Sequence, residues 1–528
     1  MPPAHVALIP RTGSETSAMP LSQIAASKTS SKLNHHRANV TPSLLLASPC
    51  ASSCTPIDCR TPAASASQRP LEQLTRADPQ HRHRRPCFVA HHGNPHGPQP
   101  HHPPLELVKV ERFEGERVSS GGGLLSNVTG AVTNFLNATE HQSHETRAKG
   151  GAIDSRDLSV RVEPFTANSG TDVRSPDESA REVIRLTFQT EGHRYEADVP
   201  TPSSRSAVMK KLDDGPHDLT AVYVSNGALL AIFSSARLEA WMSELHNDWP
   251  LTLLSIPGTH NSPTCYKALP SVRCQAVGVP EQLRNGVRFL DIRVSANPDD
   301  DALALVHSAF PISLTGNKYF GDMLTDIYRF LDENPSETII MSLKREGTGK
   351  GTDGQLGKYL KYSYVDKTRD KWWTEPKIPT LGQARGKIVI VRRFALDDDM
   401  RQACWDGRGW GIDAQQWPDN CEDGTGGNGN FRIQDFYEIT ESQNIEKKIS
   451  ASNFFNATCW PERIAAKVNP AVVEYLCINH GEHEKGPNKL KVGDAGTGIV
   501  ITDWVGANDN WDLIRCIVGM NARLQLKK

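Results

Sequence analysis

The chain has 528 residues, too many for one ordinary hydrophobic core, so two or three domains with additional unfolded segments are expected. Its net charge of −2 divides into +6 over residues 1–104, from ten Lys or Arg and four Asp or Glu, and −8 over the rest. A mildly acidic body argues against a nucleic-acid-binding protein, which usually displays a basic patch or stripe.

The sequence also argues against a membrane-spanning chain, because no apolar run approaches the roughly 18–20 residues of a transmembrane helix. The first twenty residues lack the basic and then apolar pattern of a secretory signal peptide. The eleven cysteines are an odd number and form no CxxC pair, which favours reduced thiols inside a cell. We expect a cytoplasmic protein or one in peripheral contact with a membrane; secretion stays open if the true start lies elsewhere.

Residues 1–104 are predicted to be disordered. They hold 16 of the 35 prolines and 10 of the 19 histidines and show neither a strand nor a helix period. Such a composition cannot bury enough apolar surface to offset the entropy lost on ordering. Cys50, Cys54 and Cys59 lie near histidines, but their spacing lacks the paired ligands of a metal site, so we interpret them as incidental.

From residue 105 the sequence changes to apolar–polar alternations that are typical of half-buried antiparallel strands. Six predicted strands cover residues 105–113, 158–165, 182–189, 193–199, 218–225 and 228–234. A Gly-rich insertion, residues 121–139, interrupts them. We expect residues 105–235 to form a small β-sandwich or barrel-like domain, whose role, structural or lipid-binding, stays open.

Strands and helices alternate after a short predicted helix at residues 236–245. The eight strand-like segments are residues 251–256, 287–294, 302–308, 338–344, 387–394, 431–439, 472–478 and 498–504. The clearest helix spans residues 321–335 and places five apolar side chains on one face: Met323, Leu324, Ile327, Phe330 and Leu331. This alternation over residues 245–520 predicts an α/β fold, a parallel (β/α)8 barrel of the TIM type.

Seven of the eight predicted strands carry ionisable residues at or near their carboxyl ends, where a parallel barrel forms its active site. These residues, with one amide, are His260, Asn261, Asp291, Arg293, His307, Lys344, Arg345, Glu346, Arg392, Arg393, Asp435, Tyr437 and Asp503. Each of them alone has an ordinary explanation, such as a loop hydrogen bond or a solvated strand end. In a barrel, however, they converge on one mouth.

Two histidines, several cations and two or three aspartates suit intramolecular cleavage of a phosphodiester. One histidine removes a proton from the attacking hydroxyl and the other protonates the leaving oxygen, since imidazole titrates near neutrality. A guanidinium between them stabilises the charge that develops on the phosphoryl oxygens. An aspartate behind each histidine fixes its tautomer.

Four motifs, in this order along the chain, resemble those of a known family. The segments SIPGTHNS, QLRNGVRFLDIRV, LALVHSAF and NPSETIIMSLKRE resemble the X domain of phosphatidylinositol-specific phospholipases C of the bacterial type. The resemblance covers residues 245–520. It implies a distorted (β/α)8 barrel that cleaves phosphatidylinositol in membranes to diacylglycerol and inositol 1,2-cyclic phosphate. Membrane contact is then expected to be transient and peripheral.

The resemblance assigns roles residue by residue. His260 matches the general base for the inositol 2-hydroxyl, and His307 matches the general acid for the diacylglycerol leaving group. Arg293 matches the arginine that contacts phosphate, and Asp291 matches its carboxylate partner, also placed near the acid histidine. Asp503 matches the aspartate behind the base through a looser motif.

Further positions match residues that line the inositol pocket: Lys344, Arg392, Arg393, Asp435 and Tyr437. In calcium-dependent relatives carboxylates surround the ion, whereas here Arg293 and Lys344 stand at positions used there for acidic ligands. Two fixed cations would repel Ca²⁺, so we predict catalysis without a metal or other cofactor.

Asn261 departs from well-known bacterial-type members, which have Asp at this position. The amide can hydrogen-bond the inositol 2-hydroxyl or Arg293 but carries no charge. Asparagine also occurs here in the calcium-dependent branch, which is the one argument for calcium. Two other functions stay open: a catalytically weak phosphoinositide-binding scaffold, and a phosphodiesterase acting on glycosylated inositol lipids. The sequence names no protein partner.

Overall fold

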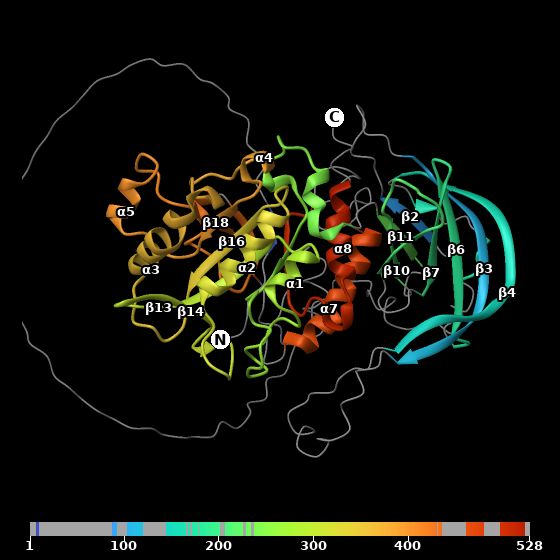
Figure 1. Cartoon of the computed structure of the whole chain (residues 1–528), viewed down its shortest axis with the longest axis horizontal. Helices are drawn as coiled ribbons and strands as arrows, with labels where there is room; N and C mark the ends of the chain where they lie inside the picture. The colour runs from blue at the N-terminus through green and yellow to red at the C-terminus, as the bar shows by residue number, and fades with distance from the viewer. Residues whose placement is uncertain are drawn as a thin grey trace, which may run out of the picture. The chain divides into compact units, whose positions relative to one another are not determined.

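A computed structural model gives the structure of the chain (Figure 1). It describes residues 7–9, 87–91, 103–119, 144–164, 167–168, 172–177, 179–200, 206–224, 229–233, 237–429, 431–435, 461–479 and 497–522. Three predictions fall wholly or mostly outside these residues: the disorder of residues 1–104, the insertion at 121–139, and the site residue Tyr437.

Two five-stranded sheets account for the predicted antiparallel strands (Figure 1). One has the order β4-β3-β6-β7-β9, from His144–Val162, Leu105–Ser119, Glu182–Thr190, His193–Val199 and Lys210–Lys211. The other has the order β5-β2-β11-β10-β8, from Ala167–Asn168, Cys87–His91, Leu229–Phe233, Thr220–Val224 and Ser206–Val208.

Both of these sheets contribute to one buried cluster, in which Leu107 and Phe188 of the first sheet join Leu230 and Ile232 of the second. All six predicted strands of this region are confirmed, although β3 and β4 run longer than expected. A shared core between two sheets is the arrangement of a β-sandwich. The domain limits at 105 and 235 remain a prediction.

A third sheet contains most of the strands predicted for residues 245–520, in the order β17-β18-β16-β13-β12-β22-β1-β21-β20. In that order the strands are Trp372–Trp373, Ile388–Arg392, Ile339–Arg345, Phe289–Asn297, Ile256–Thr259, Ile499–Thr502, Ala7–Ile9, Phe431–Asp435 and Cys421–Gly426. A further short strand, β19 (Ile412–Asp413), pairs with β18.

The run from β22 through β12, β13 and β16 to β18 is parallel throughout. Its strands are buried on both faces, so β18 reads as an apolar run, whereas β13 carries the buried charges of Asp291 and Arg293. The predicted α/β class is therefore confirmed. Among the described residues the pairing path stays open, since no pairing joins β20 to β17, β18 or β19.

Two of the predicted strands of this region are wrong in type or direction. Residues 302–308 belong to β14 (Asp300–His307), which pairs antiparallel with β13 as a hairpin and with β15 (Phe310–Pro311). Residues 472–478 lie in helix α7 (Pro461–Glu474) and the π-helical turn η10 (Tyr475–Asn479). A short apolar run such as VVEYLCI cannot be told from a buried helix by periodicity alone.

The remaining predicted segments differ less from the observed elements. Residues 251–256 form a 3-10 turn, η6 (Leu251–Leu253), before β12, and the helix predicted at 236–245 is the 3-10 helix η5 (Leu238–Glu244). The predicted helix at 321–335 is confirmed as α2 (Phe320–Glu333), with its five apolar residues buried. The other α-helices are α1 (Val279–Arg284), α3 (Asp353–Tyr359), α4 (Leu381–Ala384), α5 (Asp398–Ala403) and α8 (Asp512–Gly519).

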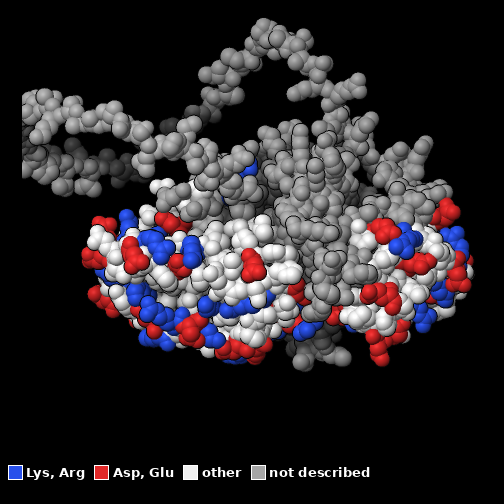
Figure 2. Space-filling model, turned by 90° about the horizontal axis from the view of Figure 1, so that it is seen from above, with Lys and Arg blue, Asp and Glu red and all other residues white. Residues whose placement is uncertain are grey.

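The charged surface is mixed. On the coloured part of the face in Figure 2, Lys and Arg are interspersed with Asp and Glu, and neither sign forms a continuous surface. None of the described helices combines the length and apolar character required to cross a bilayer.

A buried ion pair holds the amino-terminal ends of β13 and β16 together. Arg288 and Glu337 are fully buried and lie 2.8 Å apart between guanidinium and carboxylate. The guanidinium also donates to the carbonyls of Leu283, Val287, Leu238 and Glu239, so that η5 is tied to the same point. The side-chain polar atoms of this pair are all used in structural contacts. The pair lies at the amino-terminal ends of the strands, whereas the candidate site lies at their carboxyl ends.

Replacing Glu337 with Gln leaves the Arg288 guanidinium buried without a counter-charge. We expect a loss of about 3–5 kcal/mol in the free energy of unfolding, measured by urea denaturation. The matched control is Glu333→Gln at the exposed end of α2, for which we expect a change within about 0.5 kcal/mol. Equal stabilities for the two variants would contradict this role of the pair.

Candidate active site

The predicted polar residues gather at the carboxyl ends of the parallel strands. His260 and Asn261 directly follow β12, Asp503 directly follows β22, and Asp291 and Arg293 lie within β13. Three further residues of the cluster are His307 at the end of β14, Lys344 near the end of β16, and Asp435 at the end of β21. His307 reaches it because β14 folds back over β13, and not as the end of a parallel strand.

His260 is fixed by a carboxylate. Its Nδ1 lies 3.0 Å from Oδ1 of Asp503, and both side chains are fully buried. An ionised carboxylate only accepts, so Nδ1 carries the proton and Nε2 keeps a lone pair. Gln275 donates to the His260 carbonyl, which holds the backbone in place. This is the arrangement that orients a general base.

His307 is fixed differently from the prediction. No hydrogen bond between His307 and Asp291 is found; instead its Nδ1 lies 2.9 Å from the carbonyl oxygen of Val272, with Sγ of Cys274 at 3.6 Å. Its Nε2 is buried and finds no hydrogen-bond partner among the described residues. The rings of His260 and His307 have centroids 5.7 Å apart at an angle of 82°.

Burial, and next the charge of Arg293, lowers the pKa of His307 to about 4. The imidazole is therefore neutral at pH 7 in the unliganded site. An anion bound at Arg293 would remove the second of these two effects and raise the pKa again.

Arg293 is the centre of a buried charge network. Its Nε donates to Asp291 at 3.1 Å, and its Nη1 lies 3.3 Å from Glu346, which also accepts from Lys344 at 2.8 Å. Arg393 approaches Asp291 at 3.5 Å. Burial alone would raise the pKa of Glu346, but Arg293 and Lys344 outweigh it and hold that pKa at about 2. Against the effect of burial, Arg293 and Arg393 lower the pKa of Asp291 as well, so both carboxylates are charged at neutral pH.

Two of the other predicted pocket residues, Arg393 and Arg392, point to opposite sides at the end of β18. Arg393 stacks on the ring of Trp417 at 4.0 Å, and the indole of Trp417 donates to Asp435 at 2.8 Å. Burial raises the pKa of Asp435 to about 6. Arg392 points the other way, to the carbonyl of Trp410 and to Asp413, because successive strand residues face opposite sides.

The structure does not bring Arg392 into the cluster, and Tyr437 lies outside the described residues. Sequence reasoning did not select two residues that the structure places in the cluster, Cys274 and Trp417. It placed Glu346 at the strand ends but gave it no role, whereas the structure pairs it with Arg293 and Lys344. Cys274 and Trp417 lie in loops, where neither periodicity nor spacing distinguishes them.

Several buried polar atoms of this cluster find no hydrogen-bond partner among the described residues. They include both side-chain atoms of Asn261, Nε2 of His307, Oγ of Ser342, Nε of Arg393 and Oδ1 of Asp435. Folded proteins rarely leave buried polar groups unsatisfied, and a concentration of them in one place requires an explanation. Donors and acceptors held together in this way fit a polar ligand with several hydroxyl groups.

Residues 247–394 match the family model described as phosphatidylinositol-specific phospholipase C, X domain. These residues are thus similar to the X domain of phosphatidylinositol-specific phospholipases C. The chain is 34% identical over 171 residues to 1-phosphatidylinositol phosphodiesterase of Listeria monocytogenes, a match that covers 30% of this chain and 50% of that protein. The protein of the same name in Staphylococcus aureus is 27% identical over 295 residues, 51% of this chain and 88% of that protein.

Among solved structures, phosphatidylinositol-specific phospholipase C from Listeria monocytogenes is 23% identical, covers 54% of this chain and 99% of its own, and has a TM-score of 0.40. This chain therefore matches half the length of the Listeria relative in sequence and most of the Staphylococcus relative. These matches bear out the predicted resemblance, and both relatives are named as phosphodiesterases.

The depressed pKa of His307 predicts an observable titration. In ¹⁵N NMR of the ligand-free protein we expect its imidazole, assigned by its absence from His307→Gln, to titrate near pH 4. An unfolded histidine titrates near pH 6.5. Between about pH 6.5 and 4, His307 therefore binds a proton in the unfolded chain but not in the folded one. This residue therefore lowers stability as the pH falls through that window. Titration of the folded imidazole at pH 6–7 would contradict the proposed burial.

Proposed function

We propose that this protein cleaves phosphatidylinositol to diacylglycerol and inositol 1,2-cyclic phosphate by general acid–base catalysis with His260 and His307. The observation that carries this proposal is the pair of buried imidazoles, 5.7 Å apart, beside the Arg293 guanidinium. Each ring is oriented by a different acceptor, Asp503 or the Val272 carbonyl. A binding module has no need of such a pair.

The proposed reaction is one internal displacement at phosphorus. Nε2 of His260 removes the proton of the inositol 2-hydroxyl, and that oxygen forms a bond to phosphorus. The bond from phosphorus to the diacylglycerol oxygen breaks, and protonated His307 gives that oxygen its proton. Arg293 stabilises the negative charge on the non-bridging oxygens during the step.

His307 must carry a second proton to act as the acid, although it is neutral in the empty site. The phosphodiester substrate brings a negative charge to Arg293, which is the second cause of the lowered pKa. Substrate binding therefore supplies the charge that returns the pKa of His307 toward neutrality, where general acids are effective.

The inositol ring requires both donors and acceptors, because each hydroxyl is both. Lys344 and Arg393 supply donors, and Asp435 supplies an acceptor, at the edge of the same cluster. The unsatisfied amide of Asn261 offers one of each next to His260. We propose these four residues as the inositol pocket.

We propose that the reaction needs no metal. A hard cation such as Ca²⁺ takes six to eight oxygen ligands. The carboxylates nearest the cluster centre, Asp291 and Glu346, are already bound to Arg293, Arg393 and Lys344. The guanidinium of Arg293 stands where a cation would otherwise stabilise the phosphoryl oxygens.

We further propose that the strands close into a distorted barrel. Trp417 stacks on Arg393, which directly follows β18, and donates to Asp435 at the end of β21. The open path of the described sheet has β18 with its short partners toward one end and β21 with β20 toward the other. One side chain therefore bridges the two sides of the opening.

Membrane contact is proposed for the rim patch, five exposed apolar residues next to the site: Tyr266, Leu269, Phe310, Leu314 and Tyr319. Leu314 is 64% exposed and Phe310 49%. Phe310 pairs directly with His307 across β14 and β15, and Leu314 is hydrogen-bonded through its backbone to Lys267 in the loop after β12. Apolar residues with a nearby lysine suit an anionic lipid surface.

Replacing either histidine with Ala should cut diacylglycerol release from phosphatidylinositol vesicles by roughly 10²–10⁴-fold, since that is the usual contribution of a general acid or base. The control is His246→Ala, a histidine in contact with Trp249 and not part of the cluster, for which we expect no such loss. Near-normal turnover in His260→Ala or His307→Ala, with an unchanged circular dichroism spectrum, would contradict the roles. Tight vesicle binding without turnover in the wild type would favour a phosphoinositide-binding scaffold.

Replacing Leu314 with Asp should weaken binding to phosphatidylinositol vesicles by roughly tenfold or more, because one buried leucine contributes about 1.5–3 kcal/mol. The matched control is Ile153→Asp in β4, an equally exposed apolar residue (64%) outside the rim patch. Cosedimentation with vesicles measures both. If the two variants bind vesicles equally well, the rim patch is not the contact surface.

A further inference from the structure

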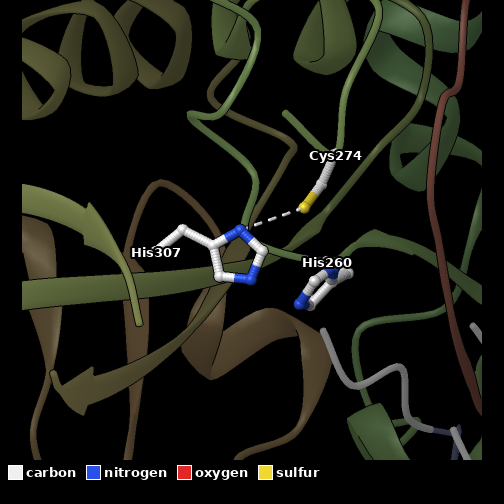
Figure 3. A group of neighbouring side chains, drawn as sticks. All are labelled: His260, Cys274 and His307. Atoms are coloured by element: carbon white, nitrogen blue, oxygen red, sulfur yellow. Dashed lines mark hydrogen bonds between the residues drawn. The ribbon is translucent and has the colours of Figure 1, made fainter. Parts of the chain in front are cut away.

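A cysteine stands beside the two histidines of the site. One ligand atom from each of His260, Cys274 and His307 lies within 4.8 Å of the other two, and all three residues are buried. Figure 3 shows the thiol and the two imidazoles turned toward a common space. The proposed phosphodiester cleavage gives the thiol no task.

The loop that carries the thiol is tied to both histidines. The Val272 carbonyl accepts from His307, and Gln275 donates to the carbonyl of His260. The backbone N–H of Cys274 donates to Oγ1 of Thr264 at 3.1 Å. One short segment, residues 272–275, therefore holds the Cys274 thiol next to the imidazoles of His260 and His307.

Both imidazoles also have the outer partners that metal-ligating histidines have. Such histidines donate one ring N–H to a carboxylate or a backbone carbonyl, which fixes the tautomer and aims the second nitrogen at the ion. Here Nδ1 of His260 is bound to Asp503 and Nδ1 of His307 to Val272. Nε2 of His307 is buried and lacks a hydrogen-bond partner among the described residues.

We propose that His260, Cys274 and His307 form a binding site for one divalent ion of the zinc type. The ion occupies the nitrogens that the acid–base reaction uses, so binding inhibits the enzyme reversibly. The inhibition rests on the proposed function, whereas the binding of the ion does not.

The geometry requires the sulfur to move. Ligand atoms in a tetrahedral zinc site with bonds of about 2.0–2.3 Å lie roughly 3.3–3.7 Å apart. Sγ of Cys274 lies 3.6 Å from Nδ1 of His307, the nitrogen that donates to the Val272 carbonyl. Binding through Nε2 therefore requires the Cys274 side chain to turn toward that nitrogen, and the fourth position is left for water.

The charges around the site permit an added dication. Three cations, Arg293, Arg393 and Lys344, face four carboxylates, those of Asp291, Glu346, Asp435 and Asp503. Coordination deprotonates the thiol, so the bound ion adds a net single positive charge to a cluster with one excess negative charge. Burial raises the pKa of the Cys274 thiol well above its ordinary value, so without an ion the sulfur is neutral.

The ligand set selects the class of ion. Thiolate and imidazole suit Zn²⁺, Co²⁺ and similar ions, whereas Ca²⁺ and Mg²⁺ require oxygen ligands. Inhibition by zinc is therefore compatible with a reaction that needs no calcium.

The test uses the full chain, reduced and freed of metal by dialysis against a chelator, with Co²⁺ as the probe. A thiolate bound to tetrahedral Co²⁺ gives a charge-transfer band and strong visible absorption. We expect one equivalent with this signature, lost in Cys274→Ala and in Cys274→Ser. The matched control, Cys265→Ala, removes a half-buried thiol in the same loop region and should keep the signature. Comparison with variants is needed because residues 1–104 alone carry ten histidines and four cysteines.

Persistence of the full signature in both folded Cys274 variants, or its absence from the wild type, would overturn the site. Loss of the signature in Cys265→Ala would assign the sulfur ligand elsewhere. Thermal unfolding of each variant checks that it is folded.

A second measurement separates this site from the proposed function. Stoichiometric Zn²⁺ should abolish diacylglycerol release by the wild type, and chelator should restore it, while Cys274→Ser should require at least tenfold more Zn²⁺ for the same fractional inhibition. Equal zinc sensitivity of wild type and Cys274→Ser would refute the inhibitory role. If the wild type binds Co²⁺ as expected but releases no diacylglycerol without metal, the site stands and the proposed function fails.

Discussion

The buried ion pair between Arg293 and Asp291 is the interaction on which the rest of the site depends. Both residues lie on β13, a strand buried on both faces, where an unpaired charge would be very costly. From the neighbouring strands, Glu346 forms a second ion pair with Arg293, and Arg393 forms a second ion pair with Asp291. Because these groups satisfy one another, a guanidinium stays charged and fixed beside two buried imidazoles. A phosphodiester that enters this space meets a preorganised positive charge and needs no reorganisation.

Different parts of the molecule were predictable to different degrees. Strands β16 and β18 follow from apolar runs, and the positions of His260 and Asp503 follow from where β12 and β22 end. The antiparallel direction of β14 was predictable but overlooked, because residues 295–301 between the two predicted strands are too few for the crossover that a parallel pair needs. Arg392 and Arg393 could not be separated without the register of β18, because a shift of one residue exchanges the two faces.

Long-range contacts account for the remaining differences. The Val272 carbonyl behind His307 comes from a loop 35 residues away in sequence, where an aspartate was expected. Cys274 enters the site through the same loop. Asn261 is buried beside His260 with its amide unsatisfied among the described residues. The carboxylates that compensate Arg293 are therefore Asp291 and Glu346, and the proposed acid, His307, is oriented by a carbonyl.

The most direct test of this account is phosphorus NMR of the products formed from phosphatidylinositol vesicles, with and without a calcium chelator. An attack by the inositol 2-hydroxyl, driven by His260 and His307 without metal, predicts a cyclic phosphate resonance as the first product at equal rates in both samples. A first product that is only the acyclic phosphate, or a reaction that stops with chelator and resumes with Ca²⁺, would contradict it.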